Sequence, residues 1–282
     1  MPHDTDRLTR FIAAIPKAEL HCHLLGAVRR STFEDLSRRA QARRTTPGGE
    51  APPSAAEIDA FYTRGDKPVG VLRVLRALDR WLLTEPDDFH RLTYEYLQDA
   101  AAHHVRHAEF FWNPTGTARV SGLSYARVQG AIRRAIADAR HDLGISARLI
   151  PSIDREAGAS AAMEMLEWVL DQLADQWPDE VALADSIGVA VPTDVRERVG
   201  LVTGIAPHVA LRCHFHNTRN TGLANVAAAV EAGVSAIDAS LGGVGGCPFA
   251  PNATGNVPTE DVAYLLQRMG YDTGVDLDVL SQ

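Results

Sequence analysis

The sequence lacks the features that mark membrane-spanning, secreted and nucleic-acid-binding proteins. Its 282 residues hold no continuous apolar run of about 18 residues, so no membrane span is expected. The first twenty residues have neither a long apolar core nor a small-residue cleavage site, so no secretory signal is expected. A formal net charge of -8 argues against a protein that binds nucleic-acid backbones, which usually carries a basic stripe.

Cysteine is also scarce. The three cysteines, Cys22, Cys213 and Cys247, are odd in number and form no CxxC motif, which favours a reduced, cytoplasmic protein. The content of 45% hydrophobic and 23% charged residues is that of a globular protein. A chain of 282 residues can form one large domain or two small ones, and α/β barrels of one domain have about this size.

What the sequence does contain is a regular alternation of strand-like and helix-like segments. Apolar positions in the longer segments recur every three or four residues, the period of a helix. The expected strands are 18–24, 105–112, 147–153, 181–187, 209–216 and 234–240. The expected helices are 69–83, 89–104, 125–144, 159–177, 192–205, 220–233 and 258–270.

Such alternation predicts a parallel sheet with right-handed crossovers, either a barrel or a doubly wound sheet. The barrel is favoured because polar, chemically active residues follow so many of the strands. The Pro/Gly/Ala-rich segment 43–57 is expected to be a surface loop over the mouth. Only six strands are recognised in place of eight, so the expected fold is an α/β TIM-like barrel that is incomplete or open.

Two His-x-His pairs stand at the ends of strand-like runs. AELHCHLLG contains His21 and His23, and RCHFHNT contains His214 and His216. Side chains at positions i and i+2 of a strand point to the same face, so each pair is expected to project together. Two imidazoles on one face can chelate a divalent ion, whereas the alternative is a hydrogen-bonded polar pair in a loop. The occurrence of two such pairs favours metal binding.

The segment around the first pair reads IPKAELHCHLLGAVRRSTFEDL, and LTYEYLQDAAAHHVRHAEFFWNPTG and GISARLIPSIDRE follow it. Over about residues 8–178 the chain thereby resembles the adenosine deaminase branch of the amidohydrolases, whose first strand carries a zinc-binding His-x-His. The resemblance implies that His21 and His23 are zinc ligands. Leu25 departs from the pattern, because the family has an acidic residue there that contacts the nucleoside sugar.

The deaminase pattern does not continue downstream. The chain lacks the family's His-Ala-Gly-Glu motif, which supplies a third zinc ligand and the catalytic acid, and it lacks the Ser-Leu-Gly-His-Gly strand and the terminal Asp-Asp pair. Deamination needs a zinc-activated water and a carboxylic acid that protonates the ring nitrogen. The usual carrier of the second task is therefore absent.

The remaining chain carries VALADSIGVAVP, RCHFHNTRNTGLANVAAAVEAGVSAIDASLGGVGGCPFAPNATGNVPTEDVAYLL and GYDTGVDLDVL. From about residue 180 onward these segments resemble 3-hydroxy-3-methylglutaryl-CoA lyase, a member of the metal-dependent TIM-barrel lyases and aldolases. The loop GGVGGCP and the segment GNVPTEDV are the most specific parts of the likeness.

The lyase resemblance implies a set of residue roles. His214, His216 and Asn256 would be metal ligands, and Glu260 a carboxylate behind them. The catalytic residues would be Cys247 of the loop and Asp185 near the metal. A mobile lid that brings the cysteine over the substrate would be formed by Gly242, Gly243, Gly245 and Gly246. The alternative for Cys247 is a small buried hydrophobic residue.

The lyase family's first strand is missing from the chain. It would bear an Arg-Asp-Gly-like motif with a metal ligand and an arginine, and ELHCHLLG stands in its place. We therefore expect one barrel domain over 1–282 that joins a deaminase-like part, 1–178, to a lyase-like part, 179–282. His21 or His23 would replace the missing aspartate at one divalent metal ion. A nitrogen-rich ligand set favours zinc, and a lyase-like set magnesium or manganese.

Three further polar residues lie in or directly after expected strands. Glu109 shares a face of the second expected strand with Phe111 and is a candidate catalytic carboxylate, or equally a buried hydrogen-bonded one. Asp154 and Arg155 close the third expected strand and are candidates for binding a substrate carboxylate or phosphate. A salt bridge that caps a helix is the alternative for this pair.

Three functions remain open. The residue inventory favours a divalent-metal-dependent carbon–carbon lyase of the hydroxymethylglutaryl-CoA lyase type, in which the metal stabilises the departing enolate. The alternatives are a zinc-dependent purine nucleoside deaminase and a catalytically inactive metal-binding chimera. The expected partner is a small molecule, an acyl-CoA or a purine nucleoside, with no nucleic acid and no membrane. Unpaired strand edges also favour a homo-oligomer.

Overall fold

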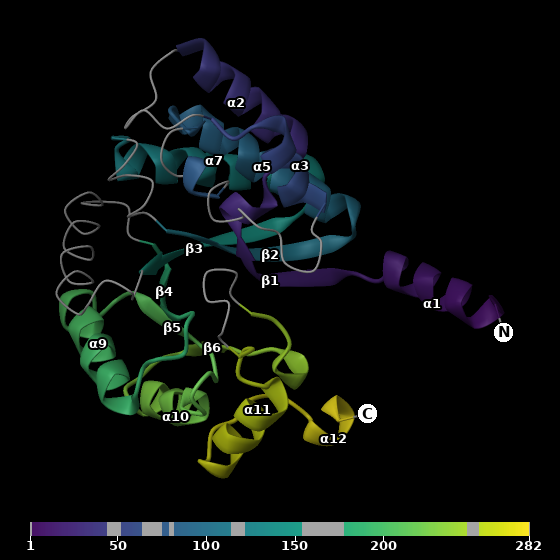
Figure 1. Cartoon of the computed structure of the whole chain (residues 1–282). Helices are drawn as coiled ribbons and strands as arrows, with labels where there is room; N and C mark the ends of the chain where they lie inside the picture. The colour runs from purple at the N-terminus through teal and green to yellow at the C-terminus, as the bar shows by residue number, and fades with distance from the viewer. Residues whose placement is uncertain are drawn as a thin grey trace. The chain divides into compact units, whose positions relative to one another are not determined.

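The protein is described by a computed structural model. It covers residues 2–43, 52–63, 75–78, 82–113, 122–153, 178–246 and 254–281. These residues form two compact units, Met1–Ile150 and Pro151–Gln282, with the boundary inside a strand (Figure 1). The division expected at 178/179 from the two resemblances stays a prediction.

Six parallel strands follow one another along the described chain in the order β1-β2-β3-β4-β5-β6. The strands are β1 (Lys17–His23), β2 (Val105–Trp112), β3 (Ser146–Ile153), β4 (Glu180–Asp185), β5 (Ala210–Phe215) and β6 (Ala236–Asp238). Each begins and ends within two residues of its expected range. The α/β class is confirmed. The part of the chain that is described has two strands fewer than the eight of a complete barrel, consistent with an incomplete TIM-like barrel.

The helices precede, separate and follow the strands. They are α1 (Pro2–Ala14), α2 (Arg30–Arg43), α3 (Ala55–Thr63), α5 (Pro86–Ala102), α7 (Tyr125–Leu143), α9 (Pro192–Ile205), α10 (Gly222–Glu231), α11 (Thr259–Arg268) and α12 (Leu277–Leu280), with short turns η1 (Leu24–Ala27) and η4 (Leu241–Gly243). Five of the expected helices are confirmed as α5, α7, α9, α10 and α11. The expected helix 159–177 and most of 69–83 lie outside the described residues.

The expected surface loop 43–57 is wrong at both ends. Arg43 is the last residue of α2, and α3 already begins at Ala55. The residues 44–51 lie outside the described part. No helix in the described ranges combines the length and apolarity that a membrane crossing demands.

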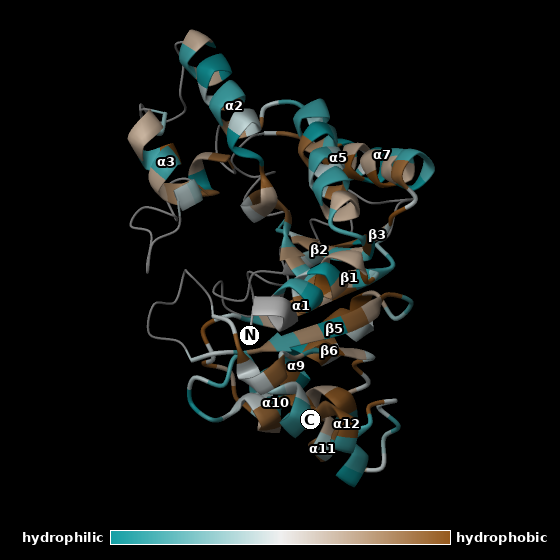
Figure 2. Cartoon of the chain, turned by 90° about the vertical axis from the view of Figure 1, so that its right-hand side faces the viewer, coloured by the Kyte–Doolittle hydropathy of each residue, from teal (hydrophilic) through white to brown (hydrophobic). Residues whose placement is uncertain are grey.

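In the first unit, α5 and α7 lie side by side against the strands (Figure 1). Trp112 at the end of β2 packs between Phe89 of α5 and Tyr125 of α7, with ring centroids 6.0 and 5.2 Å away, and all three are buried. Hydrophobic and hydrophilic residues alternate along α5 (Figure 2), as expected for a helix that covers a sheet with one face.

The first strand is not regular. The pairing of β1 with β2 steps from Glu19↔Ala108 to Cys22↔Phe110, so three residues of β1 advance against two of β2. His21 lies in this bulge with a φ of 64°, the left-handed region. The regular alternation on which the expectation for His21 and His23 rests is therefore interrupted at the bulge. The two rings nevertheless lie close together, with centroids 5.3 Å apart and planes at 76°.

In the second unit, β5 pairs with β4 on one side and with β6 on the other. Helices α9 and α10 pack against each other, and α10 also contacts α11. The turn from β5 into α10 is set by Asn217, whose Oδ1 accepts the N–H of Gly222 at the helix start, 3.1 Å away. The end of β5 is held next to the segment that begins at Thr254 by the bridge between His216 and Asn256 and by the backbone hydrogen bond from Asn217 to Gly255.

Candidate functional site

The end of β5 brings two buried histidines together. His214 is the fifth residue of the strand and His216 follows its last residue, and they are 6% and 3% exposed. Their ring centroids lie 5.0 Å apart, with the planes at 77°. The expectation that these two side chains project together agrees with this geometry. Two close imidazoles in a buried position suit a divalent ion.

The orientation of His216 is set by the backbone around it. Its Nδ1 lies 3.0 Å from the carbonyl oxygen of Thr254, so the ring donates its Nδ1–H there and keeps Nε2 for another partner. Its own backbone N–H donates to the carbonyl of Asp185, 3.2 Å away. His216 also forms an antiparallel bridge with Asn256, which places this candidate ligand beside it.

Asn256 and Glu260 both hold the glycine-rich loop. The Nδ2 of Asn256 donates to the carbonyl oxygen of Val244, 2.9 Å away, which leaves Oδ1 as its free ligand atom. Both carboxylate oxygens of Glu260 lie 3.0 Å from the backbone N–H of Gly242. The first turn of α11, where Glu260 stands, is thus tied to the loop.

Two glycines of this loop are required by close contacts. Gly243 has a φ of 66°, and a Cβ there would lie 2.8 Å from the carbonyl oxygen of Asn256. Gly245 has a φ of 112°, and its Cβ would lie 2.8 Å from the side-chain amide nitrogen of Asn256. Two of the four predicted lid glycines therefore seat the loop against Asn256, whereas a Cβ on Gly246 would meet nothing within 4 Å. Lid motion stays a prediction.

Asp185 occupies a structural position. Its Oδ1 accepts the N–H groups of Gly188 and Val189 at 2.7 and 3.1 Å, and its Oδ2 accepts that of Ala190 at 2.8 Å. The carboxylate, 1% exposed as a residue, thereby closes the turn that follows β4. These hydrogen bonds give Asp185 a structural role. Its catalytic role stays a prediction.

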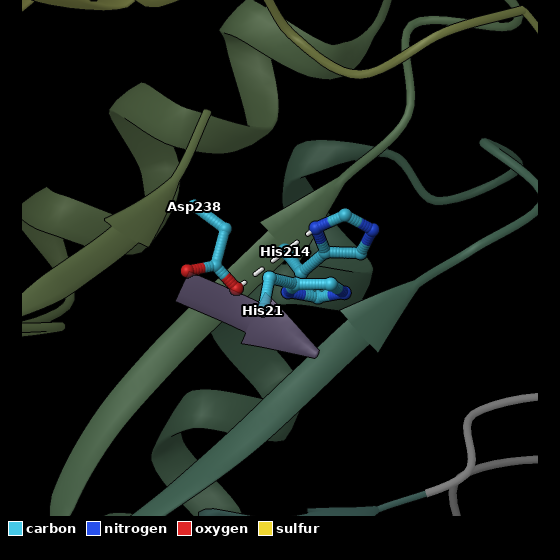
Figure 3. Close-up of side chains that lie close together, drawn as sticks. All are labelled: His21, His214 and Asp238. Carbon is cyan, nitrogen blue, oxygen red and sulfur yellow. Dashed lines mark ion pairs between the residues drawn. The ribbon is translucent and has the colours of Figure 1, made fainter. Parts of the chain in front are cut away.

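A buried charge network next to His214 was not predicted from the sequence. The guanidinium of Arg212 lies 2.7 Å from Glu180 of β4 and 2.7 Å from Asp238 of β6. The other oxygen of Asp238 lies 4.0 Å from Nδ1 of His214 (Figure 3). His21, also labelled in Figure 3, belongs to β1 of the first unit. The signal in the sequence was only a single Asp within the apolar sixth strand; that it pairs in register with His214 is shown by the structure.

The environment of the network shifts the pKa values of Arg212 and of the neighbouring Cys213. Burial opposes the charge on Arg212, but the hydrogen bonds to Glu180 and Asp238 outweigh it, so the pKa of Arg212 is raised above its ordinary value. Burial also raises the pKa of the Cys213 thiol to about 12, and the charge of Asp238 acts in the same direction. Cys213 is therefore a neutral, buried thiol.

The first unit carries the other histidine pair. The ring centroid of Phe111 on β2 lies 4.2 Å from that of His21 and 6.1 Å from that of His23. Desolvation by the surrounding protein disfavours the imidazolium form of His23, and the charge of His21 acts in the same direction. The pKa of His23 therefore falls to about 4, although part of the residue is exposed to solvent. His23 is thus neutral at pH 7, the state that binds metal.

Glu109 lies on the Phe111 side of β2 and is 9% exposed. Its Oε1 is 3.5 Å from Nε2 of His107. This supports the alternative of a buried, partnered glutamate as much as a catalytic one. Three other candidates, Cys247, Asp154 and Arg155, lie outside the described residues.

Comparison with known proteins supports both resemblances. Residues 89–282 match the model of the HMGL-like family. The (R)-citramalyl-CoA lyase of Chloroflexus aurantiacus is 44% identical over 117 residues, which are 42% of this chain and 37% of that protein. The chain thus spans little more than a third of this curated relative.

Two solved structures are similar as well. A zinc-bound amidohydrolase from Burkholderia ambifaria has a TM-score of 0.67 and 47% identity, over 82% of this chain and 60% of its own. The HMG-CoA lyase of Brucella melitensis has a TM-score of 0.52 and 33% identity, over 66% of this chain and 67% of its own. The relatives of the lyase part agree with the expectation of an enzyme. With more than half of its length matched by the family model, the chain belongs to the HMGL-like family.

Proposed function

We propose that the chain is a divalent-metal-dependent carbon–carbon lyase that acts on an acyl-CoA of the hydroxymethylglutaryl type. The observation that carries the proposal is the buried pair of His214 and His216, with the Nδ1 of His216 engaged by Thr254 and its Nε2 left for a ligand. Asn256 stands beside this pair with Oδ1 as a further donor. Two imidazoles and one amide oxygen fit a divalent cation.

The proposed reaction breaks the bond between C2 and C3 of a 3-hydroxyacyl thioester. The 3-hydroxyl loses its proton, C3 becomes a carbonyl carbon, and the bonding electrons pass to C2 as the thioester enolate, which then takes up a proton. A bound divalent ion would supply Lewis-acid stabilisation of the oxygens that gain negative charge.

Within this proposal the chain's own residues position and cover the substrate. His214, His216 and Asn256 would hold the ion. Glu260 would keep the glycine-rich loop anchored at Gly242, so that the loop carries its cysteine to a constant place. Cys247 would donate the proton that C2 receives, as the lyase resemblance implies.

We also propose that the first strand completes the ligand set. The support is the sequence alone, because both resembled families take a metal ligand from their first strand, and this chain offers His21 and His23 there. A ligand set with additional imidazole nitrogen favours zinc over magnesium.

Metal analysis of the purified chain tests the ligand assignment. We expect about one zinc ion per chain by mass spectrometry of the acid-digested protein, and its loss in His214→Ala/His216→Ala. The exposed His208 offers a matched control, and His208→Ala should keep its metal. Unchanged metal content in the double variant would exclude these histidines as ligands.

Thioester cleavage tests the reaction. We expect release of a short acyl-CoA from hydroxymethylglutaryl-CoA or citramalyl-CoA, and its loss in Cys247→Ala with the metal retained. Full activity of Cys247→Ala would remove the cysteine from its proposed role. Comparison of His21→Ala/His23→Ala with the wild type, in metal content, tests the first-strand ligands separately.

A zinc-dependent deaminase of purine nucleosides is a second candidate. Its support is the 47% identity to a zinc-bound amidohydrolase and the His21–His23 pair gathered at Phe111. Release of ammonia from adenosine or adenine, abolished in His21→Ala/His23→Ala, would establish it. Bound metal with neither activity would instead identify an inactive chimera of two barrel parts.

A further inference from the structure

One largely buried carboxylate next to the proposed metal ligands has no part in the function proposed above. Asp238 is the last residue of β6 and pairs in register with His214 of β5. Its side chain is 10% exposed. Figure 3 shows it turned toward His214, with the ion pair drawn as a dashed line.

Arg212 and Glu180 fix the position of this carboxylate. Its Oδ1 accepts from Nη1 of Arg212 at 2.7 Å. Arg212 is in turn held by Glu180, through Nε at 2.7 Å and Nη2 at 3.5 Å. With Oδ1 engaged in this way, Oδ2 is the oxygen that lies 4.0 Å from Nδ1 of His214.

The two oxygens of Asp238 face different groups. Oδ1 accepts from Arg212, whose guanidinium also contacts Glu180 at two nitrogens. Oδ2 faces the His214 ring on the neighbouring strand.

We propose that Asp238 is a positioning residue that holds the His214 ring at Nδ1 and turns its Nε2 toward the metal ion. His216 offers a comparison, because its Nδ1 donates to Thr254 at 3.0 Å and its Nε2 remains for a ligand. In His214 the corresponding contact of Nδ1 is the 4.0 Å ion pair with Asp238. A histidine that binds metal usually donates its other ring N–H to a carboxylate or carbonyl, which sets both tautomer and orientation. The inference rests on the proposed function.

The test is the affinity for Zn²⁺ and Co²⁺ of the metal-depleted protein, measured by competition with a chelator. We expect Asp238→Asn to weaken binding by roughly 10- to 100-fold, the usual effect of removing such a partner. The visible absorption of the bound Co²⁺ should shift, because the orientation of one ligand changes. A merely structural role would leave this spectrum unmoved.

Glu180→Gln is the matched control. It makes the same change from carboxylate to amide in the same network, but the contact of Asp238 with His214 is kept. We expect its metal affinity to stay within about threefold of the wild type, even where its melting temperature falls. An equal loss of affinity in both variants would overturn the inference, since the network and not the contact would then be responsible.

The outcomes separate the two proposals. A wild type that binds no metal would overturn the proposed function and this inference with it. Metal binding that depends on His214 and His216 but is unchanged in Asp238→Asn would overturn the inference alone. If Asp238→Asn does not fold, Asp238→Glu takes its place, and an unchanged Co²⁺ spectrum in that variant would count against the positioning role.

Discussion

Replacement of Arg212 by methionine should destabilise the protein more than any substitution of a surface ion pair. The guanidinium faces Glu180 and Asp238 at 2.7 Å each, and its side chain is only 10% exposed. Methionine keeps much of the side-chain volume but removes the charge. Two buried carboxylates would then lie close together without the cation between them.

The size of the effect follows from the burial of the partners. Glu180 and Asp238 are 3% and 10% exposed at their side chains, so water can do little to solvate them after the substitution. Breaking a buried pair from one side costs about 3–5 kcal/mol. At about 2–4 °C per kcal/mol for a domain of this size, the melting temperature should fall by roughly 6–20 °C.

Thermal unfolding followed by circular dichroism measures this shift. The control is Arg196→Met, which removes an exposed pair with Glu231, both side chains being 52% exposed, and should cost less than about 1 kcal/mol. Adding Glu180→Gln to Arg212→Met should recover part of the loss, because one unpaired carboxylate disappears. Equal shifts for Arg212→Met and Arg196→Met would refute the reasoning.

Two further predictions concern the loop and the thiols. Gly243→Ala should lower the free energy of unfolding in urea by at least about 1–2 kcal/mol, because Gly243 has a positive φ and a Cβ there would lie 2.8 Å from a carbonyl oxygen. The control is Gly200→Ala on α9, which should be neutral or stabilising. Equal effects of the two substitutions would contradict the close contact at Gly243. Burial raises the pKa of Cys22 to about 11 and that of Cys213 to about 12, so these two of the three thiols should not react with iodoacetamide at pH 8 in the native protein. Peptide mass spectrometry locates the label, and rapid alkylation of Cys22 or Cys213 would contradict the prediction. Both folded-state pKa values lie above the ordinary 9.0, so the contribution of these two thiols to stability should be constant below pH 9 and fall as the pH rises from 9 to about 12.

Much of the fold could be predicted from local pattern. A strand that is buried on both faces needs a short apolar run, and a covering helix needs an apolar stripe every three to four residues, so the sequence carries both signals directly. This is why all six strands and α9 were found close to their observed bounds. The helices α2 and α3 were missed because they adjoin a Pro/Gly-rich segment that suggested a loop.

The candidate site was predictable only in part. His-x-His at the end of a strand pointed to His214 and His216, and the glycine-rich motif pointed to the loop that Asn256 and Glu260 hold. The use of Asp238 was not predictable, because a single acidic residue in an apolar strand carries no signal of its partner.

The sequence by itself determined the alternation of strands and helices, the histidine pair of β5 and the presence of a glycine-rich loop. Tertiary structure alone decided that His21 sits in a bulge, that Asp185 closes a turn and that Asp238 faces His214. The physical reason is register. Periodicity along the chain tells which face a side chain takes, but the hydrogen bonds between strands set which residue of the next strand lies opposite.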